Sequence, residues 1–408
     1  MPPRGVLKTS VRYFLLTSSH LANSTDTTKP GKRIMIVAGE ASGDLHGAEL
    51  VRELMALDSS LTLSGIGGTG MAAAGVNLLC DISRLAVMGL IEVISRLKDI
   101  RAAMKILENQ FQSNRPDLLV LIDYPGFNLE LARRAKKYNI PVLYYISPKI
   151  WAWREGRIKS IKKYVDRMAV ILPFEKKFYE GHGVEVDFVG NPLLDQVRTT
   201  LTSNEFKSRY EIDNDATVIG IMPGSRKQEI AKLLPVFMQT ALLLNSEIKN
   251  CVFLLPLAST LTVDDLNEHG ASDDRLDIRI IKDKRYETMA VCDAAMAASG
   301  TLTMELAILQ VPMVVCYRIA KLTHFLAKPF IKAEFASLVN LVAEKEVVPE
   351  LLQQQATPEN TYRKILPLLL NRETREAMKQ KLAHVAKQLG EPGGSKRTAR
   401  LAMEMLTK

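Results

Sequence analysis

The sequence predicts an α/β protein with two Rossmann-like domains, each built on a parallel sheet that helices cover on both faces. Short continuous apolar runs, typical of strands buried on both faces, alternate with amphipathic helical stretches along most of the chain. The alternation breaks once, near residues 190–200, and then restarts. The 408 residues are enough for two domains of ordinary size. We therefore expect two parallel sheets that face a central cleft.

The first domain is predicted to span residues 33–192. Its expected strands are the apolar runs at 34–38, 61–66, 118–122, 142–146, 167–172 and 186–189. The helical stretches between them include 47–57, 100–111 and 129–138, where apolar residues recur at helical spacing.

The second domain is predicted to span residues 193–358. The segment Gly-Asn-Pro-Leu-Leu-Asp at 190–195 interrupts the pattern, and a charged helix is expected over 204–210. Strands are then expected at 218–222, 252–257, 278–281, 294–298 and 313–317. Residues 359–408 are predicted to be helical and to pack on the first domain or on a partner subunit, which allows a homodimer.

Composition excludes several classes of protein. With 47% apolar and 24% charged residues, the chain is typical of a soluble globular protein, and no apolar run reaches transmembrane length. The net charge of +9 suits an anionic membrane surface or phosphate ligands, and no nucleic-acid-binding motif is present. Residues 1–32 are basic and rich in Ser and Thr, and we expect a disordered N-terminal extension.

The cysteines and histidines indicate neither a metal site nor a disulfide framework. The four cysteines are far apart, without a C-x-x-C pair, and the six histidines are scattered. We therefore expect no metal site, and a reducing cytosol as the compartment.

Four loops that follow predicted strands carry polar residues, at the edge where open α/β sheets bind ligands. In the first, residues 39–44, small residues allow a sharp turn and the next helix offers N–H groups to an anion. Its carboxylates, Glu40 and Asp44, favour hydroxyl binding or proton transfer. Capping of the helix by Ser42 or Asp44 is an equally good explanation.

The second loop begins with Asp123, directly after the strand predicted at 118–122. A carboxylate at the end of a buried strand can have the raised pKa that a general base needs. The alternative is ordinary turn chemistry, because an Asp shortly before a Pro-Gly pair, here Pro125 and Gly126, is typical of a turn.

The third and fourth loops suit phosphate. In the third, Gly224 and Ser225 allow close approach of the backbone, and Arg226 provides bidentate contacts to a diphosphate. In the fourth, Ser299, Gly300 and Thr301 open a helix, and Glu305, about one turn further, suits a ribose. The alternatives are a surface ion pair for Arg226 and helix capping by Ser299 or Thr301.

Three further segments allow two interpretations each. Residues 65–70 match the dinucleotide pattern G-x-G-x-x-G, but no following strand is predicted to present a ribose acid, so the match is weak. Residues 85–97 are almost wholly apolar with basic flanks, as in an interfacial helix or one buried on several sides. Both tryptophans, Trp151 and Trp153, lie beside Arg154 and indicate either an amphipathic ligand or core packing.

Seven segments, in order along the chain, together resemble the bacterial lipid-A-disaccharide synthases. The resemblance covers nearly everything from residue 33 on, and residues 1–32 fall outside it. The segments are V-A-G-E-A-S-G-D (37–44), L-A-V-M-G-L-I-E-V (85–93), S-P-K-I-W-A-W-R (147–154), L-P-F-E-K-K-F-Y (172–179), P-G-S-R (223–226), A-S-G-T-L-T-M-E (298–305) and S-L-V-N-L-V (337–342).

This resemblance implies the GT-B fold and an inverting UDP-sugar transferase that needs no metal and no nucleotide cofactor. The implied reaction joins 2,3-diacylglucosamine from UDP-2,3-diacylglucosamine to 2,3-diacylglucosamine 1-phosphate through a β-1,6 bond and releases UDP. It forms the lipid A disaccharide of lipopolysaccharide, and the enzyme would be cytoplasmic, bound peripherally to the anionic inner face of the inner membrane. A related enzyme for another UDP-sugar, or a silent binding protein, are the alternatives.

The resemblance also implies roles for individual residues. Asp123 is the implied general base, although an acid of the first loop, Glu40 or Asp44, is an alternative. Arg226 would bind the diphosphate, with Gly224, Ser225, Ser299, Gly300, Thr301, Glu305 and Asn340 on the donor side. Acceptor and acyl-chain contacts would come from Ser42, Met88, Ile91, Val93, Trp151, Trp153 and Arg154. Tyr124 to Gly126 and Val339 depart from the pattern, where another acid and a proline are expected.

Overall fold

The computed structural model describes residues 31–82, 97–152, 155–318 and 334–407. The chain divides into Met1–Gly31 and the compact unit Lys32–Lys408, to which all described helices and strands belong. The predicted N-terminal extension therefore lies almost wholly outside the described residues. So do Trp153, Arg154 and most of the apolar stretch 85–97, including Met88, Ile91 and Val93.

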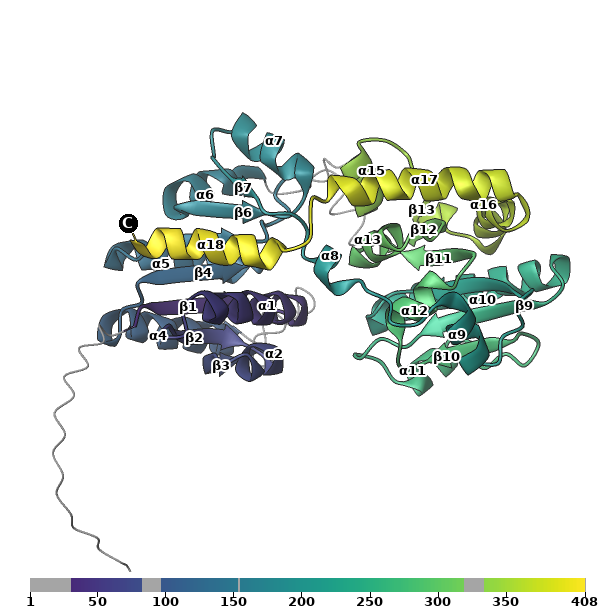
Figure 1. Ribbon diagram of the computed structural model, residues 1–408, viewed down its shortest axis with the longest axis horizontal. Helices are drawn as coiled ribbons and strands as arrows, with labels where there is room; N and C mark the ends of the chain where they lie inside the picture. Colours follow the sequence, from purple (N-terminus) through teal and green to yellow (C-terminus); the bar gives the residue numbers. More distant parts are fainter. Residues whose placement is uncertain (1–30, 83–96, 153–154, 319–333, 408) are drawn as a thin grey trace, which may run out of the picture. The chain divides into compact units, whose positions relative to one another are not determined.

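The N-terminal half forms a sheet of seven parallel strands in the order β3-β2-β1-β4-β5-β6-β7 (Figure 1). In the central strand β4 every residue is buried, as expected for a strand with helices on both faces. The strands are β1 (Arg33–Ala38), β2 (Thr62–Gly67), β3 (Asn77–Asp81), β4 (Leu118–Ile122), β5 (Val142–Tyr145), β6 (Arg167–Val170) and β7 (Asp187–Phe188).

The second half forms a sheet of six parallel strands in the order β10-β9-β8-β11-β12-β13. In both sheets the strand order reverses beside the first strand, between β1 and β4 and between β8 and β11. Such a switch point leaves a crevice at the carboxyl ends of the strands, where ligands bind. The strands are β8 (Thr217–Met222), β9 (Cys251–Pro256), β10 (Ile278–Ile281), β11 (Ala294–Ala298), β12 (Met313–Tyr317) and β13 (Glu350–Leu352).

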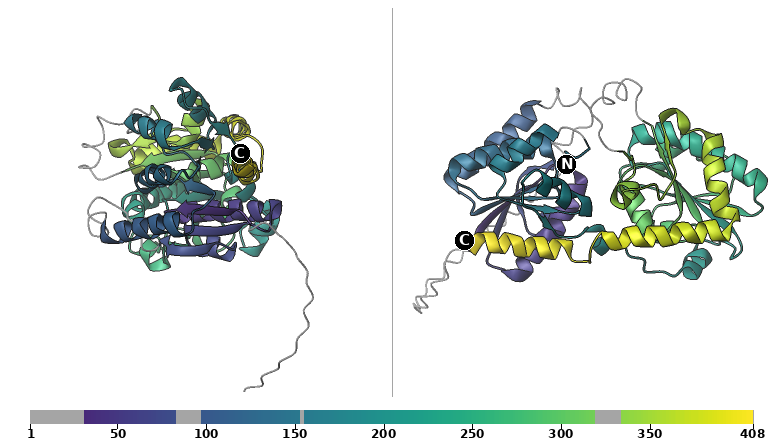
Figure 2. Two further views of the ribbon diagram at one scale, coloured as in Figure 1. Left: turned by 90° about the vertical axis from the view of Figure 1, so that its left-hand side faces the viewer. Right: turned by 90° about the horizontal axis from the view of Figure 1, so that it is seen from above.

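Helices flank each sheet (Figure 2), and separate apolar clusters fill the layers. In the first half they are α1 (Ala41–Leu57), α2 (Thr69–Ala73), α4 (Leu97–Ser113), α5 (Pro125–Ala135), η2 (Lys136–Tyr138), η3 (Glu155–Arg157), α6 (Ile158–Tyr164) and α7 (Pro173–Gly181). In the second they are α8 (Leu193–Gln196), α9 (Ser203–Arg209), α10 (Lys227–Glu247), α11 (Val263–Asn267), α12 (Arg285–Ala290), α13 (Thr301–Ile308), α15 (Leu338–Ala343), η5 (Gln353–Gln355), α16 (Pro358–Leu370) and α17 (Arg372–Gln388).

The last helix, α18 (Gly394–Thr407), leaves the second half and packs on α1 of the first (Figure 1). Its Ala399 and Ala402 belong to the same buried cluster as Leu50 and Leu54 of α1. Helix α16 packs instead on α10, and α17 packs on α13. The C-terminal helices thus divide between the two halves of their own chain.

The two connections between the halves cross at glycines. A Cβ on Gly394 would lie 2.9 Å from the carbonyl oxygen of Gly190, which itself has a φ of +78°. Backbone and side-chain bonds hold the crossing: Asn191 N donates to Leu389 O at 2.9 Å and Arg397 Nε donates to Val189 O at 2.8 Å. The break expected at 190–195 is therefore a tightly packed crossover.

The predicted α/β class with two parallel sheets is confirmed, and two strands were missed. All residues of β3 are at least partly exposed, and β13 has only three residues. Both lie at sheet edges, so neither has the continuous buried run that reveals a central strand.

Candidate active site

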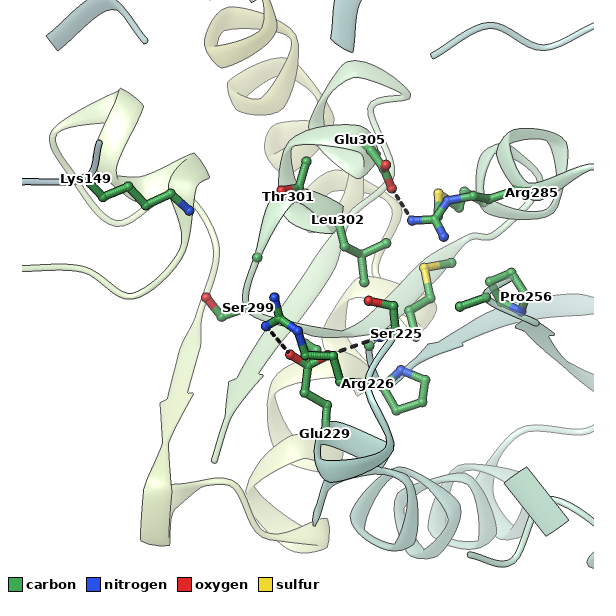
Figure 3. A pocket seen from close by; sticks show the side chains of 17 residues that line it. Lys149, Ser225, Arg226, Glu229, Pro256, Arg285, Ser299, Thr301, Leu302 and Glu305 are labelled. Carbon is green, nitrogen blue, oxygen red and sulfur yellow. Dashed lines mark hydrogen bonds and ion pairs between the residues drawn. The ribbon is translucent and has the colours of Figure 1, made fainter. Parts of the chain in front are cut away.

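A pocket lies at the carboxyl ends of β8, β9 and β11, at the switch point of the second sheet. Its walls are the loops predicted to bind phosphate, Pro223–Arg226 and Ser299–Thr301, together with Glu305 (Figure 3). Lys149, Glu229 and Arg285 also line it, and no sequence pattern predicts that these three residues lie together. The pocket therefore collects nearly all the residues that were expected on the donor side.

The loop after β8 is held in shape by the first turn of α10. Gly224 has a φ of +115°, and a Cβ there would lie only 2.2 Å from Glu229 Oε2. Ser225 N donates to the same oxygen at 3.1 Å, and Thr260 Oγ1 donates to Ser225 O at 2.5 Å. Only glycine fits at position 224, and without a side chain there the backbone itself lines the pocket.

Arg226 sits at the N-cap of α10, with its guanidinium exposed. Its partner in the structure is Glu229, whose Oε1 lies 3.2 Å from Nη1. An exposed pair of this kind contributes no more than about 1 kcal/mol, so the arginine can exchange it for a diphosphate at little cost. The helix N-terminus adds partial positive charge at the same place.

The loop after β11 opens helix α13. Gly300 is the N-cap and no side chain caps the helix, so the capping explanation for Ser299 and Thr301 is wrong. Ser299 Oγ donates instead to Ala336 O at 2.7 Å. Glu305 is buried, and its Oε2 accepts a hydrogen bond from Arg285 Nη2 at 2.6 Å. This ion pair holds the carboxylate at the pocket wall (Figure 3).

Asp123 lies at the switch point of the first sheet, at the end of β4. Both Asp123 and Tyr124 are in the left-handed region, with φ of 46° and 45°. Donors hold this backbone: Tyr144 Oη and Asn128 Nδ2 bond to Asp123 O at 2.5 and 2.8 Å. Strain over-determined by its surroundings is typical of functional positions. The sequence suggested neither supporting residue for this role.

The environment of Asp123 suits a general base. Burial raises the pKa of its carboxyl to about 6, Lys149 opposes the rise and Glu40 adds to it. Such a carboxylate is ionised at neutral pH and still basic enough to accept a proton. The turn explanation accounts for the backbone but not for a shielded carboxylate beside two other charges.

Glu40 follows β1, next to Asp123 across the switch point. It is exposed and occupies the N-cap of α1 without a side-chain capping bond. The two loops touch at Gly39, where a Cβ would lie 2.1 Å from the Tyr124 ring. Ser42, in the first turn of α1, is exposed as well. Glu40 therefore contributes negative charge near Asp123 from a more solvated position.

Asp44 is committed to a structural role. Its Oδ1 accepts hydrogen bonds from Gly68 N at 2.6 Å and Met71 N at 3.0 Å, and its Oδ2 accepts one from Gly70 N at 2.9 Å. The glycine-rich segment 65–70 is thus an anion-binding loop whose anion is a buried carboxylate of the protein itself. A carboxylate engaged in this way is poorly placed to act as a base, and helix capping is also not its function.

Trp151 is anchored by the buried Glu175. Its Nε1 donates to Glu175 Oε1 at 3.2 Å, and its ring packs edge-on against Phe174 with centroids 4.9 Å apart. Ser147 Oγ donates to the same carboxylate oxygen at 2.6 Å. These contacts support the core-packing explanation for Trp151. Its indole N–H is already bonded to Glu175 and is not available to a ligand.

Asn340 is not among the residues that line the pocket. Its Oδ1 accepts from Val347 N and Val348 N at 2.7 and 3.0 Å, and its Nδ2 donates to Val348 O and Glu350 Oε1. The fully buried amide therefore uses its bonding capacity to tie α15 to the segment that leads into β13. A direct contact with the donor does not follow from this geometry.

The described parts of the chain show neither a metal-binding cluster nor a membrane-spanning helix. They contain no group of three His, Cys, Asp or Glu residues arranged to hold a metal ion. Among the same residues, no helix combines the length and apolar character needed to span a membrane.

Solved structures identify the fold. A UDP-GlcNAc 2-epimerase from Neisseria meningitidis, bound to UDP-GlcNAc, matches with a TM-score of 0.64 at 13% identity, covering 91% of this chain and 100% of the other. CalG4, the calicheamicin glycosyltransferase, matches with a TM-score of 0.60 at 14% identity, covering 93% and 99%. The GT-B fold implied by the sequence is confirmed.

Sequence comparison identifies the family. The lipid-A-disaccharide synthetase family model matches residues 34–405. The lipid-A-disaccharide synthase of Geobacter metallireducens is 46% identical over 381 residues, which cover 93% of this chain and 99% of the relative. With its fold, its pocket and these relatives in agreement, the chain belongs to the lipid-A-disaccharide synthase family of glycosyltransferases.

Proposed function

We propose that this chain transfers 2,3-diacylglucosamine from UDP-2,3-diacylglucosamine to the 6-hydroxyl of 2,3-diacylglucosamine 1-phosphate, with inversion and without a metal ion. Family membership supports the substrates. The observation that supports the mechanism is the division of charge between the sites: a shielded carboxylate ends β4, and cationic groups with helix N-termini surround the pocket at β8 and β11.

In the proposed reaction Asp123 accepts the proton of the acceptor hydroxyl. The freed oxygen attacks the anomeric carbon of the donor as the bond from that carbon to the UDP oxygen breaks. One in-line displacement through an oxocarbenium-like transition state accounts for inversion. Asp123 ends protonated, which its raised pKa favours.

On the donor side, Arg226 and the amide groups that open α10 and α13 stabilise the charge that develops on UDP. The preset loop at Gly224 and Ser225 provides these donors before the reaction begins. Preorganised donors aimed at a leaving group lower the barrier without a metal ion. In this proposal Glu305, whose carboxylate accepts a hydrogen bond from Arg285, accepts hydrogen bonds from the ribose.

The test is UDP release and product mass from purified protein given both acylated substrates, with EDTA present. Wild-type turnover should persist in EDTA, require the acyl chains and disappear in Asp123→Asn. Turnover of UDP-GlcNAc alone, with epimer formation, would instead identify an epimerase. Full activity of Asp123→Asn would keep the reaction and transfer the role of base to Glu40.

We further propose that the protein associates peripherally with the anionic inner face of the inner membrane. Helix α6 carries exposed Lys159, Lys162 and Lys163 on one short element, and each lysine near an anionic surface contributes about 1 kcal/mol. Sedimentation with anionic vesicles, lost in high salt and absent with zwitterionic vesicles, is the expected result. Equal binding to both vesicle types would contradict an electrostatic association.

A further inference from the structure

Lys149 lies in the loop that follows β5, and its neighbours hold it outward. Ser147 and Ile150 on either side are buried, at 3% and 2% exposure, whereas Lys149 itself is exposed. The loop is tight, because Ile150 N donates to Pro148 O at 2.6 Å and Ala152 N donates to Lys149 O at 3.2 Å. The direction of the lysine is therefore set by its backbone.

The buried carboxylate of Glu175 fixes the loop at both ends of this turn. It accepts from Ser147 Oγ at 2.6 Å and from Trp151 Nε1 at 3.2 Å, two residues before and two after Lys149. Its other oxygen accepts from the backbone N–H groups of Ile171 and Leu172 at 3.2 and 3.0 Å. A charged group that receives four hydrogen bonds holds its donors firmly in place.

The lysine reaches the pocket without a carboxylate partner. Three cations line the pocket: Arg226 pairs with Glu229 and Arg285 pairs with Glu305. Among the described residues no carboxylate lies within ion-pair distance of Lys149. Figure 3 shows its side chain extending toward the loop that carries Ser299.

We propose that Lys149 is a further substrate-binding residue, whose ammonium binds a phosphate oxygen of the bound substrates. The inference rests on the proposed function, which supplies two sources of that phosphate: the diphosphate of the donor and the 1-phosphate of the acceptor. An ammonium is a compact point charge with three donors, suited to a phosphate that shifts during the reaction. Glu175 is then a positioning residue that acts through the loop.

The position also relates the lysine to the base. Lys149 opposes the rise of the Asp123 pKa that burial and Glu40 produce, so its charge is felt at the carboxylate. The same ammonium therefore lies within electrostatic range of the acceptor-side base and at the wall of the donor-side pocket. A phosphate bound there would meet an ammonium for which the described residues provide no salt bridge.

The experiment compares Lys149→Met, which keeps a linear side chain of similar length but removes its charge, with Lys149→Arg. Lys249→Met is the matched control, since Lys249 is exposed and precedes β9, at the opposite edge of the sheet from the pocket. For each protein, kcat and the KM of both substrates are measured, and UDP binding is measured by calorimetry. Circular dichroism and melting confirm that the variants fold.

Loss of one charge-assisted hydrogen bond predicts a KM about tenfold to a hundredfold higher in Lys149→Met, largely restored in Lys149→Arg and unchanged in the control. A higher donor KM with weaker UDP binding assigns the phosphate to the donor. A higher acceptor KM with normal UDP binding assigns it to the acceptor. Unchanged KM values for both substrates overturn the proposal, whatever happens to kcat.

The two failures are distinguishable. If wild-type protein does not turn over the acylated substrates, the proposed function fails and so does the inference that rests on it. If wild type is active and Lys149→Met equals Lys249→Met, the function stands and the inference alone is wrong. Glu175→Gln should reproduce the KM change of Lys149→Met in weaker form if the loop positions the lysine.

Discussion

Replacing Asp123 with asparagine should abolish turnover and make the N-terminal domain more stable. The side chain keeps its shape but loses its charge, and asparagine tolerates the left-handed backbone, φ 46°, at least as well as aspartate. Because burial disfavours the ionised form of Asp123, the native protein carries at neutral pH a charge that destabilises the folded state.

The magnitude follows from the pKa. A pKa of about 6 in the folded state, against 3.8 for the ordinary group, means that the folded protein binds the proton more tightly than the unfolded chain. The contribution of Asp123 to the free energy of unfolding therefore falls as the pH rises from about 3.8 to about 6, and it is constant above that range. The loss above pH 7 is about 3 kcal/mol, an upper value because the side chain is partly solvated.

Urea unfolding, monitored by tryptophan fluorescence, measures the free energy of unfolding of the N-terminal half, which contains Asp123. Both tryptophans lie in the N-terminal half, in the segment that follows β5. Asp123→Asn should gain up to about 3 kcal/mol over wild type at pH 7.5 and only about 1 kcal/mol at pH 4.5. Wild-type kcat/KM should fall about tenfold for each pH unit below 6, because the base must be ionised to accept a proton.

Two results would refute the reasoning. An asparagine variant that is less stable than wild type at pH 7.5 would mean that the carboxylate is stabilised in the folded protein and not shielded. A gain of equal size at both pH values would show that its origin is the backbone and not the charge. Retained turnover would separately remove Asp123 from the role of base.

Three other substitutions probe the remaining interactions. Asp44→Ala leaves three backbone N–H groups without their acceptor, so urea unfolding should show a loss of about 2–4 kcal/mol; a loss of turnover at unchanged stability would contradict the structural role. Asn340→Ala should lower the melting temperature while the donor KM stays constant, and a raised KM would restore a donor contact. Arg226→Lys should reduce kcat/KM about tenfold to a hundredfold by losing bidentate contacts, with stability unchanged because its ion pair is exposed; unchanged kinetics would argue against diphosphate binding.

The central strands and the loops that follow them could be predicted because their signals are local. The apolar runs 118–122, 294–298 and 313–317 coincide with the central strands β4, β11 and β12. A strand buried on both faces must be apolar throughout, so its limits are visible in the sequence. The edge strands β3 and β13 bury less and gave no comparable signal.

The loops at 223–226 and 299–301 were also predictable, since glycine and hydroxyl residues after a strand are required for a close backbone approach to an anion. Their meeting in one pocket follows from parallel strands, whose carboxyl ends share one edge of the sheet. In the same way Glu40 and Asp123 lie near each other because their strands, β1 and β4, are adjacent in the sheet.

Only the tertiary structure decided which polar groups are free to act. Asp44 and Glu40 are four residues apart in one motif, but residues 68–71 fold onto Asp44 and take its carboxylate, whereas Glu40 stays exposed. Glu175 engages Trp151 and leaves Lys149 outward, and burial, together with the nearby charge of Glu40, raises the pKa of Asp123. Sequence patterns determine where a chemical group is placed along the chain; its partners and its solvation come from residues distant in sequence, and these determine its reactivity.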